Sequence, residues 1–270
     1  MLNRLLATKE VGASVDIAIL GCSKGAEVYS ISYSIRSVRP DLVIRIRALD
    51  IDRDVVEFAR GGTYSLRTQL PGGPTCKRGD PDDDLAARTF GDQSTYVFER
   101  MTEAEIGSMF VCDGQRASVR PQFREGISWH VGDAADPGLA ESLGLQDILI
   151  ANCFLCHMQP ENAEICLHNM ARLVKPNGYM FVSGVDLGVR SKVARALGWM
   201  PETDLLREIH GGDPSLRRDW PLQYWGLEPF DESRQDQTLR YASVFRIRAE
   251  SPEMKSNHLT MSNPEGFVVQ

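Results

Sequence analysis

Small and acidic residues follow two apolar runs of the chain, at positions suited to binding a nucleotide. Gly21-Cys22-Ser23-Lys24-Gly25 follows the run Asp16–Leu20, and Asp50 follows the run Leu42–Leu49. Glycines let a backbone turn tightly and approach a ligand, and the amide groups of a following helix suit an anionic group. A carboxylate such as that of Asp50 can accept hydrogen bonds from two adjacent ribose hydroxyls. These residues predict a site for an adenosyl group.

Two later runs also end in polar residues. Asp133 and Ala134 come after Ile127–Val131, where an acidic side chain could reach an adenine amino group, and Asn152 ends the run Asp147–Asn152. Each residue alone has an ordinary explanation, because glycines after a strand usually form a turn and an Asp there usually caps a helix. Their joint position at successive strand ends favours a nucleotide-type site.

The glycine spacing separates two cofactor classes. A dinucleotide fingerprint needs Gly-x-Gly-x-x-Gly, whereas this turn is Gly21-x-x-x-Gly25 and lacks the middle glycine that a pyrophosphate approaches. The spacing therefore favours S-adenosylmethionine (SAM) over NAD, and a nicotinamide oxidoreductase is the weaker alternative.

Alternating strands and helices must position these residues. Helical spacing predicts a helix over Glu27–Val38, between the strands that precede Gly21 and Asp50, and a second helix over Asp54–Arg60, which follows Asp50 and is capped by Asp52. Parallel strands joined in this way need right-handed crossovers, and ligands bind at their carboxyl ends. We expect an α/β fold with a doubly wound, mostly parallel sheet.

The second half of the chain continues this pattern. Strands are predicted over residues 127–131, 147–152, 179–183 and 241–247, helices over 161–174, 192–197 and 203–210, and a turn at 176–178. In the helix over 161–174, Ile165, Leu167, Met170 and Leu173 are predicted to face inward. Trp220–Gly226 is predicted either to cover the substrate mouth or to form a packed aromatic cluster.

The span 61–126 interrupts the pattern and is predicted to be an insertion between the two parts of the main domain, 1–60 and 127–250. Within it, residues 70–75 and 79–84 have turn chemistry, and Thr102–Glu105 resembles a capping box that opens a helix through Phe110. Residues 251–270 are predicted to form a flexible tail.

Four segments resemble motifs of the CheR-type methyltransferases, which methylate chemotaxis receptors. Ile19–Ser30 is similar to their SAM motif, and Leu49–Asp52 with the following Val-x-x-Ala and Gly-x-Tyr is similar to their next block. Asp147–Asn152 and Leu173–Phe181 resemble two later blocks, so the resemblance covers roughly residues 16–185. It implies the class-I SAM methyltransferase (Rossmann-like) fold with an inserted subdomain, with SAM as cofactor.

The resemblance also implies roles for single residues. Glu27 would approach the amino-acid end of SAM, Asp50 the ribose, Asp133 and Ala134 the adenine, and Asn152 the transfer site. The full set of implied cofactor-binding residues is Gly21, Cys22, Ser23, Gly25, Glu27, Asp50, Ile51, Asp133, Ala134 and Asn152. In family members, an insertion at the place of residues 61–126 can contact partner peptides.

The chain departs from the family in ways that concern the acceptor. Ala151 replaces an arginine and Cys156 a tyrosine, and we expect no counterpart of the amino-terminal helical domain that grips receptors. The predicted acceptor is therefore an unidentified protein carboxylate or small molecule. The alternative is a SAM-fold sensor or adaptor without turnover.

The segment Cys153-Phe-Leu-Cys156-His157 permits three interpretations. It matches a haem c attachment pattern, but it follows a predicted buried strand in a chain without a recognisable export signal. Zinc binding would need a fourth ligand that is not evident nearby. We predict Asn152 and His157 as catalytic residues, with His157 as a proton acceptor, although a packed histidine is a competing interpretation.

Composition narrows the function classes. The net charge of −7 disfavours nucleic acid as the main partner. Membrane insertion is not expected, because the sequence lacks a run of about 18 apolar residues. Six scattered cysteines favour free thiols in a reducing cytoplasm.

Overall fold

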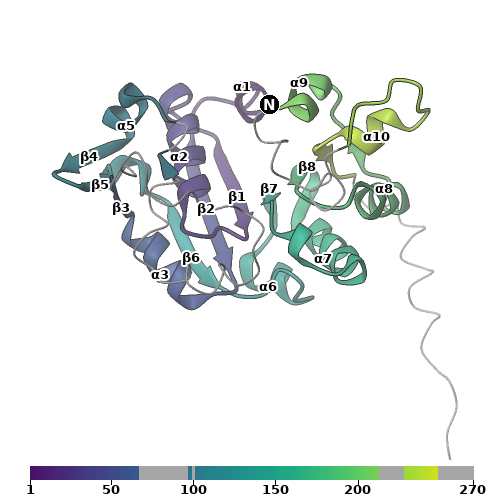
Figure 1. The fold of residues 1–270 in the computed structure, drawn as a ribbon, viewed down its shortest axis with the longest axis horizontal. Helices are drawn as coiled ribbons and strands as arrows, with labels where there is room; N and C mark the ends of the chain where they lie inside the picture. Colours follow the sequence, from purple (N-terminus) through teal and green to yellow (C-terminus); the bar gives the residue numbers. More distant parts are fainter. Residues whose placement is uncertain (67–96, 99–100, 213–227, 249–270) are drawn as a thin grey trace, which may run out of the picture.

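A seven-stranded sheet forms the centre of the protein, in a computed structural model that describes residues 1–66, 97–98, 101–212 and 228–248 (Figure 1). The strand order is β6-β2-β1-β7-β8-β10-β9. The strands are β1 (Ser14–Leu20), β2 (Val43–Asp50), β6 (Ile127–Val131), β7 (Gln146–Asn152), β8 (Val174–Ser183), β9 (Met200–Pro201) and β10 (Val244–Arg246). All neighbours pair in parallel except β10, which runs antiparallel to β8 and β9. The predicted doubly wound α/β fold of the class-I type is confirmed.

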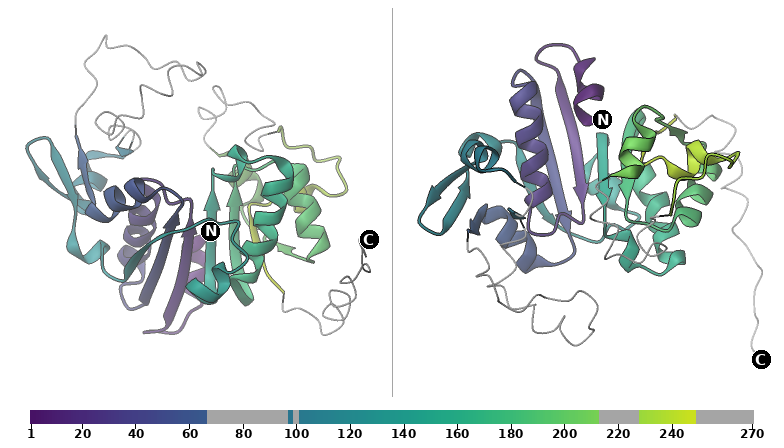
Figure 2. Two further views of the ribbon diagram at one scale, coloured as in Figure 1. Left: turned by 90° about the horizontal axis from the view of Figure 1, so that it is seen from below. Right: turned by 45° about the horizontal axis from the view of Figure 1, so that its top comes forward.

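Helices cover both faces of this sheet (Figures 1 and 2). The helices are α1 (Leu2–Ala7), α2 (Ala26–Val38), α3 (Arg53–Gly61), α5 (Glu103–Met109), α6 (Leu139–Leu143), α7 (Pro160–Arg172), α8 (Leu187–Ala196), α9 (Leu206–Gly211) and α10 (Gln237–Tyr241), with 3₁₀ turns η2 (Pro121–Phe123) and η3 (Leu155–His157). In β1, Ile17 and Ile19 pack with α1 and α2, whereas Ala18 and Leu20 pack with α6, α7 and α8. The period of two along the strand thus divides the core into two layers. Among the described residues, no helix has the length and apolar character needed to cross a bilayer.

A second, three-stranded sheet lies within the span predicted as an insertion. It consists of β3 (Thr63–Ser65), β5 (Arg116–Val119) and β4 (Phe110–Asp113), in that order and antiparallel. Its aromatic cluster reaches the main body through Tyr29 of α2, which meets Tyr64 edge to face. The capping box of Thr102 and Glu105 is confirmed at the start of α5. The domain boundaries at 61 and 126 stay a prediction. The predicted loops over 70–84, the tail over 251–270 and the Trp220–Gly226 segment lie outside the described residues.

The structure corrects three details of the prediction. Ile165 is 54% exposed, because α7 packs through Ala163, Cys166, Leu167 and Met170 instead. Tyr241 ends α10 rather than opening the last strand, which begins at Val244. The predicted turn at 176–178 lies within β8, where Asn177 N–H donates to the Ile247 carbonyl and Ile247 N–H to the Gly178 carbonyl.

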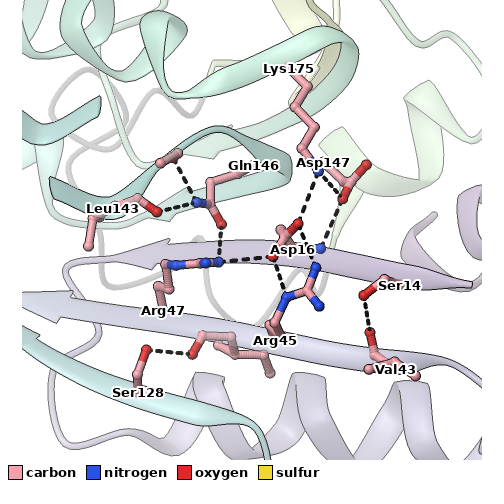
Figure 3. A network of polar contacts seen from close by, with 12 residues as sticks. Ser14, Asp16, Val43, Arg45, Arg47, Ser128, Leu143, Gln146, Asp147 and Lys175 are labelled. Atoms are coloured by element: carbon pink, nitrogen blue, oxygen red, sulfur yellow. Dashed lines mark hydrogen bonds and ion pairs between the residues drawn. The ribbon is translucent and has the colours of Figure 1, made fainter. Parts of the chain in front are cut away.

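A cluster of charged side chains joins four strands near their amino ends (Figure 3). The Asp16 carboxylate of β1 accepts hydrogen bonds from Arg45 (2.7 Å) and Arg47 (3.1 Å) of β2 and from Lys175 (3.0 Å) of β8. Lys175 also donates to Asp147 of β7, at 2.9 Å. Arg45 above all, and then Lys175 and Arg47, hold the pKa of Asp16 well below its usual range despite the opposing effect of burial.

We predict that Asp16→Asn lowers the free energy of unfolding by about 1–3 kcal/mol at neutral pH, because three cations lose their shared anion. A depressed carboxyl pKa stabilises the fold fully above the ordinary, unfolded-state value of about 4. This contribution decreases as the pH falls below that value and is lost as the pH falls through the depressed pKa of the folded state. The difference between wild type and variant, measured by urea unfolding, should therefore shrink in acid. Asp113→Asn, at an exposed position of β4, is the matched control. Equal stability of wild type and Asp16→Asn at pH 7 would contradict this role.

Candidate functional site

The glycine turn between β1 and α2 depends on backbone conformations that glycine adopts most easily. Gly21 and Gly25 have φ angles of 66° and 83°, and Ser23 also lies in the left-handed region at 46°. A Cβ atom on Gly25 would lie 2.9 Å from Trp129 of β6, and one on Gly21 would lie 2.8 Å from the ring of Phe154. The turn is therefore tight on both sides of Cys22.

The structure places Asp50 beside this turn. Ser23 N–H donates to Asp50 Oδ2 at 2.8 Å, and Asp52 N–H donates to Oδ1 at 3.2 Å. The Cys22 N–H donates to the Leu49 carbonyl at 3.0 Å, so backbone and side chain both join the two strand ends. A carboxylate offers about four acceptor positions, so Asp50 keeps capacity for further donors. The adjacent Ile51 is 70% exposed and presents an apolar surface next to it.

The loop after β6 lies next to the same strand end. Gly132 N–H donates to the Asp50 carbonyl at 2.9 Å. Asp133 is exposed and its Oδ1 accepts from Ala135 N–H at 2.8 Å, whereas Ala134 is buried in the core. The structure thus brings Asp133 to the edge that holds Asp50. Its contact with an adenine stays a prediction.

A line of hydrogen bonds connects three further elements at this edge. Ser183 Oγ of β8 donates to Asn152 Oδ1 of β7 at 2.8 Å, and Asn152 Nδ2 donates to the Glu27 carboxylate in the first turn of α2. Burial raises the pKa of Glu27, and the bond from Asn152 opposes this rise. Glu27 and Asn152, which the sequence places 125 residues apart, are therefore direct partners.

The cysteines of the site are poor nucleophiles. Burial, with the carboxylates of Asp50 and Glu27, raises the pKa of Cys22 to about 12, and burial raises that of Cys156 to about 11. Because the thiolate is the reactive form, both side chains act as apolar packing at neutral pH. His157 lies exposed at the end of η3, and its predicted role as proton acceptor stays a prediction. The described part of the chain holds no group of three His, Cys, Asp or Glu residues arranged for a metal ion.

Sequence reasoning missed two residues that shape this region. Phe154 packs against Gly21, and a phenylalanine after a strand gives no signal of which residue it will contact. Arg190 of α8 lines a cavity of about 390 Å³ together with Asn152 and Ser183. The sequence does contain a signal for Arg190. It lies three positions from Leu187 and three from Val193, so a charged residue occupies the apolar stripe of a helix.

Two family models match the chain. The model for the SAM-binding domain of CheR methyltransferases matches residues 1–72, and a methyltransferase-domain model matches residues 89–182. A comparison with curated proteins gives no match.

Solved structures of methyltransferases resemble the chain at low identity. The chain is similar to the N-methyltransferase NodS from Bradyrhizobium japonicum (14% identity, 74% of this chain and 72% of that chain covered, TM-score 0.38). It is also similar to the CurJ carbon methyltransferase (11%, 92% and 52%, TM-score 0.40) and to the DszA carbon methyltransferase (11%, 71% and 35%, TM-score 0.37). The chain thus spans about a third of the length of the DszA chain.

We predict that Asn152→Leu raises the pKa of Glu27 further, because it removes the donor that favours the ionised carboxylate. A carbon-detected NMR titration of the Glu27 carboxyl measures this pKa. Ser183→Ala is the control, since it removes only the contact to Asn152 Oδ1 and should change the Glu27 pKa less. A Glu27 pKa that stays the same or falls in Asn152→Leu would count against the hydrogen-bonded line.

Proposed function

We propose that the chain transfers the methyl group of SAM to an acceptor held beside Asn152. Residues 1–72 match the model for the SAM-binding domain of CheR methyltransferases, and residues 89–182 match a methyltransferase-domain model. The observation that supports this most directly is the Asp50 carboxylate, bound by Ser23 N–H against the glycine turn. At the carboxyl edge of the sheet, that arrangement brings together a carboxylate that can accept from ribose hydroxyls and a glycine backbone that a ligand can approach closely.

The described residues fit SAM by their chemistry. The turn Gly21–Gly25 and the amide end of α2 suit the carboxylate of the methionine part, and the Glu27 carboxylate suits its ammonium group. We assign Asp50 to the ribose hydroxyls, and Ile51, Asp133 and Ala134 to the adenine. Phe154 covers Gly21, so we assign its ring to the wall of the same site.

The protein contributes alignment and exclusion of water rather than a nucleophile. SAM supplies a methyl carbon on a sulfonium sulfur, which is already an activated leaving group. A lone pair of the acceptor forms the new bond to this carbon while the carbon–sulfur bond breaks and leaves its electrons on sulfur. A carboxylate acceptor loses no proton in this step. A hydroxyl acceptor loses a proton in this step and a protonated amine loses one before it, and His157 is then our candidate for the base.

The acceptor differs from a receptor glutamate in this proposal. Ala151 and Cys156, at the family's arginine and tyrosine positions, are both buried, and Ala151 packs in the apolar core. They supply no polar contact to an acceptor, so the acceptor must be recognised by other residues. We therefore leave both a protein carboxylate and a small molecule open at this stage.

We predict that Asp50→Ala weakens SAM binding by at least about tenfold, because hydrogen bonds to a charged group are worth about 1.5–3 kcal/mol. Isothermal calorimetry with SAM, beside NADH as the rival cofactor, measures the effect. Asp54→Ala, an exposed acid in the first turn of α3, is the control and should bind like wild type. Unchanged SAM affinity in Asp50→Ala, or tighter binding of NADH than of SAM, would refute the site.

A second measurement separates an enzyme from an adaptor. We expect the wild-type chain to transfer a radiolabelled methyl group from SAM to a component of a native lysate, and Asp50→Ala to lose this transfer. Tight SAM binding without any labelled product would instead favour the sensor or adaptor alternative.

A further inference from the structure

A cavity adjoins the proposed transfer site on the β8 side of the sheet. It has a volume of about 390 Å³, within the range of small-molecule sites. Its polar lining includes Asn152, Ser183, Arg190 and His210, and its apolar lining includes Phe181 and Ile209. The α1 and α9 helices, which lie near each other in Figure 1, both contribute to its walls. Because Asn152 contacts Glu27 and also lines the cavity, the cavity begins where the proposed cofactor site ends.

Arg190 is a buried cation in the wall of this cavity. The residue is only 2% exposed, and its guanidinium donates to the Val182 carbonyl at 3.0 Å and to the Arg240 carbonyl at 2.8 Å. Its Nε–H is buried and has no hydrogen-bond partner among the described residues. Burial lowers the pKa of Arg190 to about 10, so the group stays charged at neutral pH. The two backbone contacts fix the guanidinium but do not neutralise it.

The charge of Arg190 has no carboxylate to balance it within the described chain. None of the described residues that line the cavity is acidic, and the neighbouring Arg240 is paired with Glu228. Arg36 and Arg246 also have a buried Nε without a partner, but neither lines this cavity and neither residue is buried as a whole. Burying an uncompensated charge is costly, so an arginine placed here indicates an anionic ligand.

We propose that the cavity binds the methyl acceptor, and that this acceptor is a small molecule with a singly charged oxyanion, most simply a carboxylate, that pairs with Arg190. The assignment of the ligand as acceptor rests on the proposed methyl transfer, whereas binding of the anion does not. One guanidinium balances one negative charge, and a phosphate monoester would bring about 1.5–2. Phe181 and Ile209 provide the apolar walls for the body of such a molecule.

Benzoate and its neutral analogue benzamide test the anion site on the full chain. The two probes have similar shape, and binding is measured by ligand-observed saturation-transfer NMR. We expect benzoate to bind at least about tenfold more tightly than benzamide, because a charge-assisted pair replaces a neutral contact. Phenyl phosphate should bind more weakly than benzoate. Non-specific electrostatic attraction would not produce such a preference, because the chain has a net charge of −7 and repels anions.

Two variants locate the binding. Arg190→Gln should abolish the preference for benzoate, and Arg190→Lys should retain part of it. Because Arg190 is buried and its loss could impair folding, Ile209→Trp provides an independent probe: this residue is 37% exposed and lines the cavity, so the larger ring should fill the cavity and weaken benzoate binding. The matched control is Ile165→Trp, on the exposed face of α7.

Calorimetry with SAM in the same samples keeps the two proposals distinguishable. Equal binding of benzoate and benzamide to wild type, or undiminished benzoate binding in Ile209→Trp, would overturn the anion site even if SAM binds. Selective benzoate binding in a chain that does not bind SAM would overturn the assignment of the ligand as methyl acceptor. The full proposal is supported if wild type binds SAM and prefers benzoate, if only Arg190→Gln and Ile209→Trp weaken the benzoate binding, and if only Asp50→Ala weakens the SAM binding.

Discussion

The parallel pairing of β1 with β2 on one side and β7 on the other is the constraint on which the site depends. Leu20 lies opposite Leu49 of β2 and Ala151 of β7, so the three strands end at nearly the same level. The residues that follow, Gly21, Asp50 and Asn152, therefore meet at one edge. A register shift of one residue would move every core side chain of β1 to the other face, and the two apolar layers hold the register against it.

Charged side chains have different kinds of partner at the two ends of this sheet. Near the amino ends, Asp16 is surrounded by Arg45, Arg47 and Lys175, so the protein satisfies its own charges there. Near the carboxyl ends, backbone amides donate to Asp50 and one side-chain amide donates to Glu27. Neutral donors leave each carboxylate its negative charge, which suits a ligand with hydroxyl and ammonium groups. The charge pattern thus separates an end that stabilises the fold from an end that can bind a cofactor.

The chemistry of the site follows from what its side chains can do at neutral pH. Cys22 and Cys156 are neutral packing groups, since burial raises their pKa values. Glu27 and Asn152 form a fixed pair that joins the proposed cofactor site to the cavity of Arg190. An enzyme that positions two reactants needs this kind of rigid polar wall more than a reactive residue. The proposed anionic acceptor fits the same principle, because a buried guanidinium attracts a carboxylate by its charge and orients it through directional hydrogen bonds.

The sequence alone determined the strand–helix alternation, the glycine turn, the capping of α3 by Asp52 and of α5 by Thr102, and the sharing of one edge by Gly21, Asp50 and Asn152. These features depend on local periodicity, on turn and cap chemistry, and on the rule that parallel strands end together. Tertiary structure alone decided that Phe154 lies on Gly21, that Asn152 pairs with Glu27, and that Arg190 faces a cavity. Such contacts join residues far apart in the chain through side-chain packing, and hydrophobic spacing predicts which face of a helix is buried but not which atoms it meets. Ile165 shows the same limit. Its spacing fits an apolar stripe, but α7 packs through other residues and leaves Ile165 exposed.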